Sequence, residues 1–138
     1  MLWQGEKPLD EQDAFRENPL RLAYLGDTVW DVLTRTRLMF QGLNLHHMHE
    51  LAVLAVNAHA QAEAFRRLAD SLSEREAAMA RRGRNAHPKH AAPRHQSPED
   101  YQEATALETL FGYLYLCGQD ARIRELYDLA VRKEENHA

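Results

Sequence analysis

Hydrophobic residues recur along the chain at the three- and four-residue spacing of amphipathic helices, and no segment shows the apolar–polar alternation of a strand. The stripe over residues 20–40 comprises five large apolar side chains: Leu22, Leu25, Val29, Leu33 and Phe40. Comparable patterns predict five further helices, at about 11–16, 47–71, 73–82, 98–117 and 120–134. Residues that favour helices dominate these segments, so the sequence predicts an all-α fold.

The helix that opens with a capping box at Ser73 and Glu76 is predicted to end at Gly83. The residues that follow contain two prolines, alanines and histidines but no apolar period. The helix after them is predicted to begin at Ser97, with Pro98 as its first residue. We therefore expect one domain over residues 1–138, with a mobile basic loop at about 83–97.

Length and composition limit the class of protein. The 138 residues, 44% of them apolar, suit one domain with one core. No apolar run reaches the roughly 18 residues needed to span a bilayer, and the N-terminus lacks a signal-peptide pattern. Cys117 is the only cysteine, so no internal disulfide forms and a reducing compartment fits best. These features predict a cytoplasmic protein with no membrane partner.

Charge is unevenly distributed. The net charge is −4, yet residues 81–95 hold five Lys or Arg and no Asp or Glu. The rest of the chain is therefore acidic, and a basic segment on an acidic body favours local nucleic-acid binding over a general coating role. The alternative is a charge run that only aids solubility.

Two acidic residues stand inside apolar helical segments. Asp27 lies in the stretch LAYLGDTVWDVL, and Glu108 is the one charge in ATALETLFGYLYLCG. The second stretch is apolar all round, which predicts a central, buried helix. A carboxylate in such surroundings costs free energy unless a partner compensates it. On its predicted helix Asp27 shares a face with Asp31, away from the apolar stripe, so it faces a cleft or another helix.

Two interpretations of these carboxylates follow from the residues alone. A structural one pairs Asp27 with a backbone amide or Arg21, and Glu108 with Arg122 or Arg124; spacing by itself favours it. In a functional one both carboxylates hold a hard cation such as Mg²⁺, which also accepts waters and phosphate oxygens. Such an ion can activate a water against a phosphodiester, and the basic loop would hold the substrate. That combination indicates a metal-dependent nuclease.

Four segments, in order, resemble signatures of the ribonuclease III family, in particular its short subfamily, Mini-ribonuclease III: NPLRLAYLGDTVWD, VNAHAQAEAF, RRGRNAH and ATALETLFGYLYL. The resemblance implies an all-helical endonuclease domain, assembled as a homodimeric helical bundle whose two sites cut opposite strands of double-stranded RNA. It also implies that the separate double-stranded-RNA-binding domain of larger relatives is missing.

The resemblance further implies Mg²⁺-dependent hydrolysis that leaves 5′-phosphate and 3′-hydroxyl ends, used in bacteria to mature the ends of precursor 23S ribosomal RNA. A ribosomal protein is an open candidate partner. By position Asp27 matches the catalytic aspartate and Glu108 the metal-binding glutamate. Ala23 and Thr105 stand where larger relatives carry carboxylates, so one firmly held Mg²⁺ is expected. Asp31 is either a second, water-mediated ligand or a solvated acid.

The residues expected to contact RNA carry basic or amide side chains at the loop: Arg81, Arg82, Arg84, Asn85 and Lys89. The histidines of HHMHE offer too few ligands for a convincing zinc site and are expected at the surface. Two other functions stay open because Ala23 and Thr105 replace carboxylates. One is a catalytically inactive RNA- or ribosome-binding module of the same fold, and the other is a helical dimer that binds only proteins.

Overall fold

The computed structural model describes residues 7–86 and 97–135, and over these residues every regular element is a helix. This confirms the all-α prediction. The elements in chain order are α1 (Glu11–Arg16), α2 (Pro19–Met39), α3 (Leu45–Val56), α4 (Ala58–Leu68), the 3₁₀ turn η1 (Ala69–Ser71), α5 (Glu74–Arg84), α6 (Pro98–Leu116) and α7 (Asp120–Glu135). Within the described ranges, no helix has the length and apolar character to cross a lipid bilayer.

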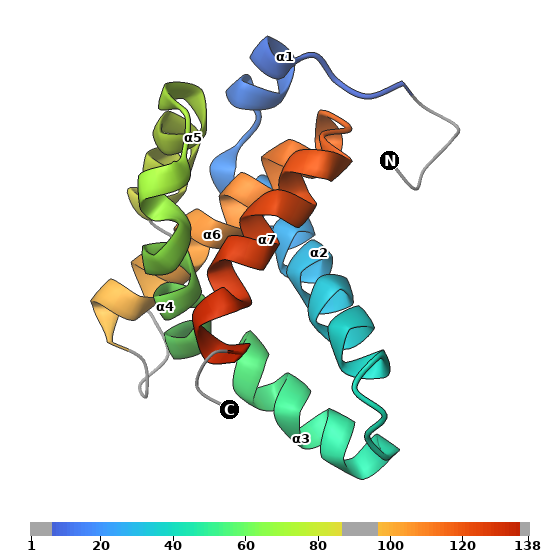
Figure 1. The fold of residues 1–138 in the computed structure, drawn as a ribbon. Coiled ribbons are helices and arrows are strands. Elements are labelled where there is room, and N and C mark those ends of the chain that lie inside the picture. The colour runs from blue at the N-terminus through green and yellow to red at the C-terminus, as the bar shows by residue number, and fades with distance from the viewer. Residues whose placement is uncertain (1–6, 87–96, 136–138) are drawn as a thin grey trace.

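Helix α6 forms the centre of the fold. Figure 1 shows it in the middle of the molecule, with α2 and α5 on opposite sides, and α2, α4 and α5 all pack along it. Five of its large apolar or aromatic side chains are fully buried: Leu107, Leu110, Phe111, Tyr113 and Leu114. The helix is buried because apolar residues occupy almost its whole circumference, as its sequence predicts.

Helices α2 and α6 cross with their backbones in contact. A Cβ atom built on Gly26 would lie 1.6 Å from the carbonyl oxygen of Glu108, and one on Gly112 would lie 2.0 Å from the carbonyl oxygen of Leu22. Only glycine permits this approach, because any side chain would overlap the opposite backbone. The two glycines therefore set where α2 meets α6.

The segment predicted as one helix over residues 47–71 is two helices and a 3₁₀ turn. The break lies at Asn57, whose backbone is extended (φ −72°, ψ 162°). Its side chain accepts a hydrogen bond from the Ala60 N–H at 2.8 Å and donates one to the Leu54 carbonyl at 2.9 Å. One asparagine thus ends α3 and caps α4. Its side chain competes with the helical hydrogen bonds of the backbone, and the apolar pattern gives no sign of this competition.

The prediction that Gly83 ends its helix is wrong, because α5 continues to Arg84. Gly83 instead faces α6, where an added Cβ would lie 2.3 Å from Oγ1 of Thr109. The predicted caps are confirmed: Ser73 and Glu76 form a capping box, and Ser97 caps α6 with Pro98 in first place. The predicted basic loop falls mainly on residues 87–96, outside the described residues.

Replacing Gly26 with alanine tests the crossing. The variant Gly26→Ala is expected to lose about 3 kcal/mol or more of unfolding free energy, because the methyl group meets the α6 backbone. Gly42→Ala is the control: Gly42 has φ +69°, but an added Cβ would meet no atom within 4 Å, so only its backbone strain, about 1–2 kcal/mol, applies. Urea denaturation measures both; equal stability of Gly26→Ala and the parent chain would refute the close crossing.

Candidate active site

The helix crossing brings Asp27 and Glu108 together. Asp27 follows Gly26 on α2, and Glu108 is the residue of α6 whose carbonyl Gly26 touches. The two side chains are hydrogen-bonded to each other. Asp27 is exposed, whereas Glu108 is partly buried. The pair therefore has one side toward the protein interior and one side open to solvent.

The two carboxyl groups are in electrostatic conflict. Burial, then the negative charge of Asp27, then the hydrogen bond to Asp27 raise the pKa of Glu108 to about 8. The pair consequently holds a proton near neutral pH in the absence of a cation. A divalent ion would take the place of that proton and remove the repulsion.

Of the three arginines that offered a structural explanation, two are engaged elsewhere, Arg124 is exposed, and no arginine lowers the pKa of Glu108. Arg21 forms an ion pair with Glu17 at 2.9 Å, and Arg122 bonds Glu76 at 2.8 Å. The Arg122–Glu76 pair is itself anchored by Arg122 donating to the Ser71 carbonyl at 2.7 Å. These two arginines therefore do not neutralise the Glu108 carboxylate, and its pKa stays raised. This weakens the interpretation of the pair as purely structural.

The donor set of the pair fits Mg²⁺. That ion binds through one or two carboxylates and keeps several waters, and Asp27 is open to solvent on the required side. Among the described residues, no group of three or more His, Cys, Asp or Glu side chains is placed to hold a metal ion. A Mg²⁺ ion at this position would therefore have Asp27 and Glu108 as its protein ligands.

Two positions that the resemblance aligns with carboxylates of larger relatives supply no carboxylate in this chain. Ala23 is a buried methyl group, and the Thr105 hydroxyl donates to the Tyr101 carbonyl of its own helix at 2.8 Å. Asp31, one turn beyond Asp27, pairs with Nε of Arg35 at 3.1 Å. Its charge is thus partly neutralised on the surface of α2, which suits a solvated acid as well as a distant ligand.

The predicted RNA contacts fall into two groups. Arg82 donates to the carbonyls of Phe15 and Glu17 and lies 5.1 Å from the Phe15 ring centroid, so it ties α5 to α1. Arg84 pairs with Glu103, which is buried on α6. Arg81 and Asn85, like Arg84, are exposed, and Lys89 lies outside the described residues.

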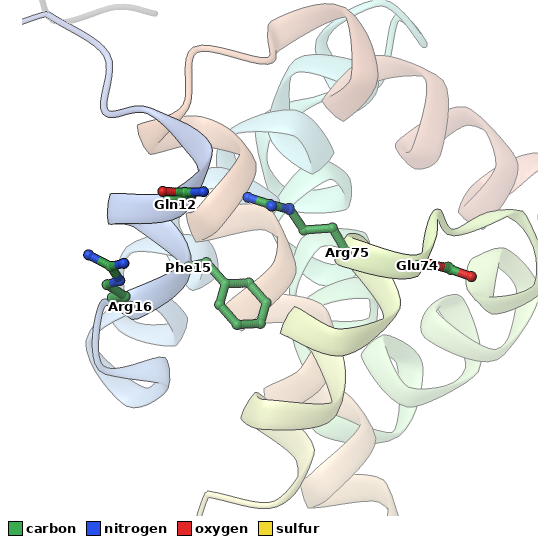
Figure 2. A pocket seen from close by; sticks show the side chains of 5 residues that line it. All are labelled: Gln12, Phe15, Arg16, Glu74 and Arg75. Carbon is green, nitrogen blue, oxygen red and sulfur yellow. The ribbon is translucent and has the colours of Figure 1, made fainter.

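A groove of about 430 Å³ lies between α1 and α5, away from the carboxylate pair (Figure 2). Its lining consists of Gln12, Phe15, Arg16, Glu74 and Arg75. Neither α2 nor α6 supplies a lining residue to this groove, so it does not coincide with the carboxylate pair. What distinguishes the pair is the raised pKa of Glu108.

A polar cluster that joins α4 to the start of α6 was not expected from the sequence. His59 and Asp100 meet there, although 41 positions separate them in the chain. Neither residue interrupts an apolar pattern, so no sequence signal marks them. Only the packing of α4 against α6 shows that they are neighbours.

Comparisons with known proteins show which proteins this chain is similar to. A family model described as the ribonuclease III domain matches residues 20–119. The chain is 42% identical over 114 residues to Mini-ribonuclease 3 of Symbiobacterium thermophilum, covering 82% of this chain and 87% of that protein. It is 43% identical over 116 residues to Mini-ribonuclease 3 of Gloeobacter violaceus, covering 84% of each. A crystal structure of a Fusobacterium nucleatum protein superposes with a TM-score of 0.79 at 28% identity, covering 88% of this chain and 94% of that one.

The carboxylate pair predicts a pH dependence of stability. Because the pKa of Glu108 is raised to about 8 in the fold, the unfolded chain ionises first, and stability from this group falls as pH rises from about 4.5 to 8. Mg²⁺ should restore it, so the rise in Tm on adding Mg²⁺ is expected to be larger at pH 8 than at pH 6. Calorimetry measures both effects.

The matched control is Glu108→Gln, which cannot ionise. In this variant the contribution of position 108 to the pH dependence and the Mg²⁺-induced rise in Tm should both disappear. An unchanged Mg²⁺ effect in Glu108→Gln would show that the ion binds elsewhere.

Proposed function

We propose that this chain, which belongs to the Mini-ribonuclease 3 group of the ribonuclease III family, uses Asp27 and Glu108 to cleave double-stranded RNA. The prediction of a ribonuclease III-type endoribonuclease is confirmed by that membership, and with it the hydrolase class. Ribonucleases of this family depend on a metal ion. The observation that carries the assignment of residues is the hydrogen-bonded carboxyl pair with its raised Glu108 pKa.

Asp27 and Glu108 would act as the ligands of one Mg²⁺ ion. When bound, Mg²⁺ supplies charge neutralisation at the phosphodiester and an activated water for in-line attack. For this, Glu108 gives up the proton that it holds in the free protein, and Asp27 presents its carboxylate toward solvent, where the duplex arrives. The products would carry 5′-phosphate and 3′-hydroxyl ends. Since Ala23 and Thr105 add no carboxylate, one ion per site is the simpler arrangement.

The duplex would be held by basic and amide groups near the end of α5. Arg81 and Asn85 are exposed there and are suited to phosphates and 2′-hydroxyls. Lys89 remains a proposed contact on the strength of the sequence. Arg82 and Arg84 bond α1 and Glu103, so their main contribution would be to fix α5, which carries Arg81.

The substrate we propose is precursor 23S ribosomal RNA in the bacterial cytoplasm, with a ribosomal protein as a candidate partner. The support is the similarity to bacterial proteins named Mini-ribonuclease 3. Incubation of precursor 23S RNA with the protein and Mg²⁺, followed by mapping of the RNA ends, tests the assignment. Cuts at the mature ends would support it, and an intact precursor would contradict it.

A homodimer is proposed at the exposed side of α2. Tyr24 is 84% exposed, so its ring is available to contact a second chain. It borders a groove of about 550 Å³ between the ends of α2 and α6, whose apolar lining comprises Leu20, Leu22, Leu25 and Leu116. Two copies related by a two-fold axis would each place Tyr24 in the other's groove and so set two active sites against one duplex.

The decisive variant for the chemistry is Asp27→Asn. It keeps the shape of the side chain but removes a charge that the metal ion needs, so cleavage of double-stranded RNA should fall by at least about 10²-fold. Helical content and RNA affinity should remain. The control is Asp31→Asn, which removes a carboxylate one turn away that is already paired with Arg35 and should retain most activity. Full activity of Asp27→Asn would end the assignment.

Tyr24→Lys tests the dimer. The lysine has no ring to fill the leucine-lined part of the partner's groove, so the variant is expected to become monomeric while its helical content is unchanged. Sedimentation velocity measures the mass. Arg21→Lys, on the same exposed helix, keeps its charge and should leave the dimer intact. A Tyr24→Lys protein that sediments as a dimer would place the interface elsewhere.

A further inference from the structure

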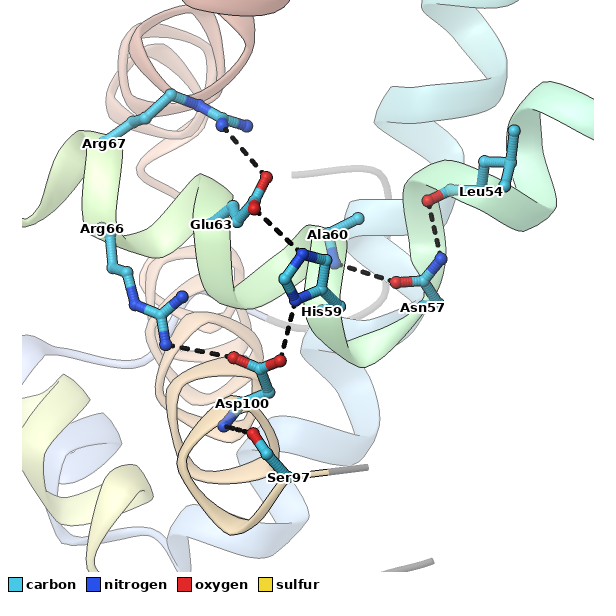
Figure 3. Close-up of polar contacts among 9 residues, drawn as sticks. All are labelled: Leu54, Asn57, His59, Ala60, Glu63, Arg66, Arg67, Ser97 and Asp100. Atoms are coloured by element: carbon cyan, nitrogen blue, oxygen red, sulfur yellow. Dashed lines mark hydrogen bonds and ion pairs between the residues drawn. The ribbon is translucent and has the colours of Figure 1, made fainter. Parts of the chain in front are cut away.

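A charged cluster connects α4 to the first turn of α6 (Figure 3). Nδ1 of His59 lies 2.8 Å from Oδ2 of Asp100, and its Nε2 lies 2.9 Å from Oε1 of Glu63. Arg66 donates to the other oxygen of Asp100 at 3.1 Å. Both ring nitrogens of one histidine are therefore in contact with carboxylates, one on its own helix and one on α6.

The number of donors and acceptors on each group determines which protonation state of the His59 ring fits this geometry. An ionised carboxylate only accepts hydrogen bonds, and a neutral imidazole has one N–H donor and one nitrogen lone pair. A neutral His59 would therefore place its nitrogen lone pair next to an oxygen of one of the two carboxylates, and the two would repel each other. Only the imidazolium form, with a proton on each nitrogen, satisfies Glu63 and Asp100 together.

Asp100 is the member of the cluster that belongs to α6. It is the third residue of that helix, and its N–H donates to Oγ of the capping residue Ser97 at 3.0 Å. Its carboxylate does not close the capping box, as Glu76 does in α5, but bonds α4 through His59 and Arg66. The first turn of α6 is thus joined to α4 by these side chains.

We propose that His59 is a proton-dependent clasp, which holds the first turn of α6 against α4 most firmly when both ring nitrogens are protonated and loosens when one proton leaves. The groups that face the ring are Glu63 on α4 and Asp100 on α6, with Arg66 and Arg67 behind them. After deprotonation the one remaining N–H serves Asp100 or Glu63 but not both, so the bond between His59 and Asp100 weakens while Arg66 continues to link α4 to Asp100. The inference is independent of the proposed catalytic roles.

The direction of the pH effect follows from the charges. The hydrogen bond to Asp100, followed by the negative charges of Glu63 and Asp100, raises the pKa of His59 above its usual value. For a base whose pKa is raised by folding, the stabilising contact is complete below the unfolded value and is lost as pH rises through the folded value. The clasp is therefore closed at acidic pH and opens toward the alkaline side.

Two NMR measurements on the full chain test the clasp. The first is the titration of the His59 ring, whose pKa should lie above about 6.5 in the parent protein and move down in Asp100→Asn. The second is hydrogen exchange at the amides of the first turns of α6 between about pH 5 and pH 8, corrected for the intrinsic rate. Protection there should fall by roughly two- to fivefold as His59 loses its proton, as expected for a solvent-exposed ionic contact.

Substitutions distinguish the clasp from general pH effects. The comparison is made in a Glu108→Gln background, because Glu108 on α6 titrates in the same pH range. There, His59→Gln should abolish the pH step in exchange at the first turns of α6, because glutamine does not titrate. His46→Gln is the matched control, since His46 pairs with the single carboxylate of Glu50 on α3 at 2.8 Å and joins no second helix; the step should persist. A His59 ring that titrates at its usual value, or a step that survives His59→Gln in that background, would overturn the proposal.

Discussion

Direct contact between the backbones of α2 and α6 is the constraint on which the rest of the site depends. Gly26 and Gly112 allow it, because neither carries a side chain that would separate the helices. Asp27 follows the first of these glycines, and Glu108 provides the carbonyl that Gly26 touches. The helices therefore place the two carboxyl groups side by side without any loop. A site built from two packed helices is held rigidly, which suits the precise positioning that phosphodiester hydrolysis requires.

The same contact creates an electrostatic conflict that the fold leaves unresolved. The raised pKa of Glu108 reflects this conflict. No arginine lowers that pKa, and Arg21 and Arg122 are paired with Glu17 and Glu76. Elsewhere in the described chain, buried acids are neutralised: Glu76 by Arg122 and Glu103 by Arg84. The fold satisfies these acids but leaves Asp27 and Glu108 competing for one proton, and this contrast supports the proposed cation site.

Much of this could be predicted from the sequence, and the failures have physical causes. Asp27 and Glu108 were recognisable because each interrupts an apolar helix, and periodicity located most helices because burial imposes it. The break at Asn57 was missed because one side chain's hydrogen bonds outweighed a continuous apolar stripe. Gly83 was misread as a helix end because a glycine required for close packing on Thr109 looks the same in sequence as a cap. His59 and Asp100 meet only through tertiary packing, which no local pattern encodes.

The location of the metal ion is the sharpest test of the proposed site. A crystal structure of the protein with Mn²⁺ in place of Mg²⁺, with the ion identified by its anomalous scattering, would show which side chains bind it. We predict an ion in contact with one carboxylate oxygen from Asp27 and one from Glu108, each at about 2.1 Å, and with waters at its other positions. An ion bound away from this pair, with Asp27 and Glu108 still hydrogen-bonded to each other, would contradict the proposed site.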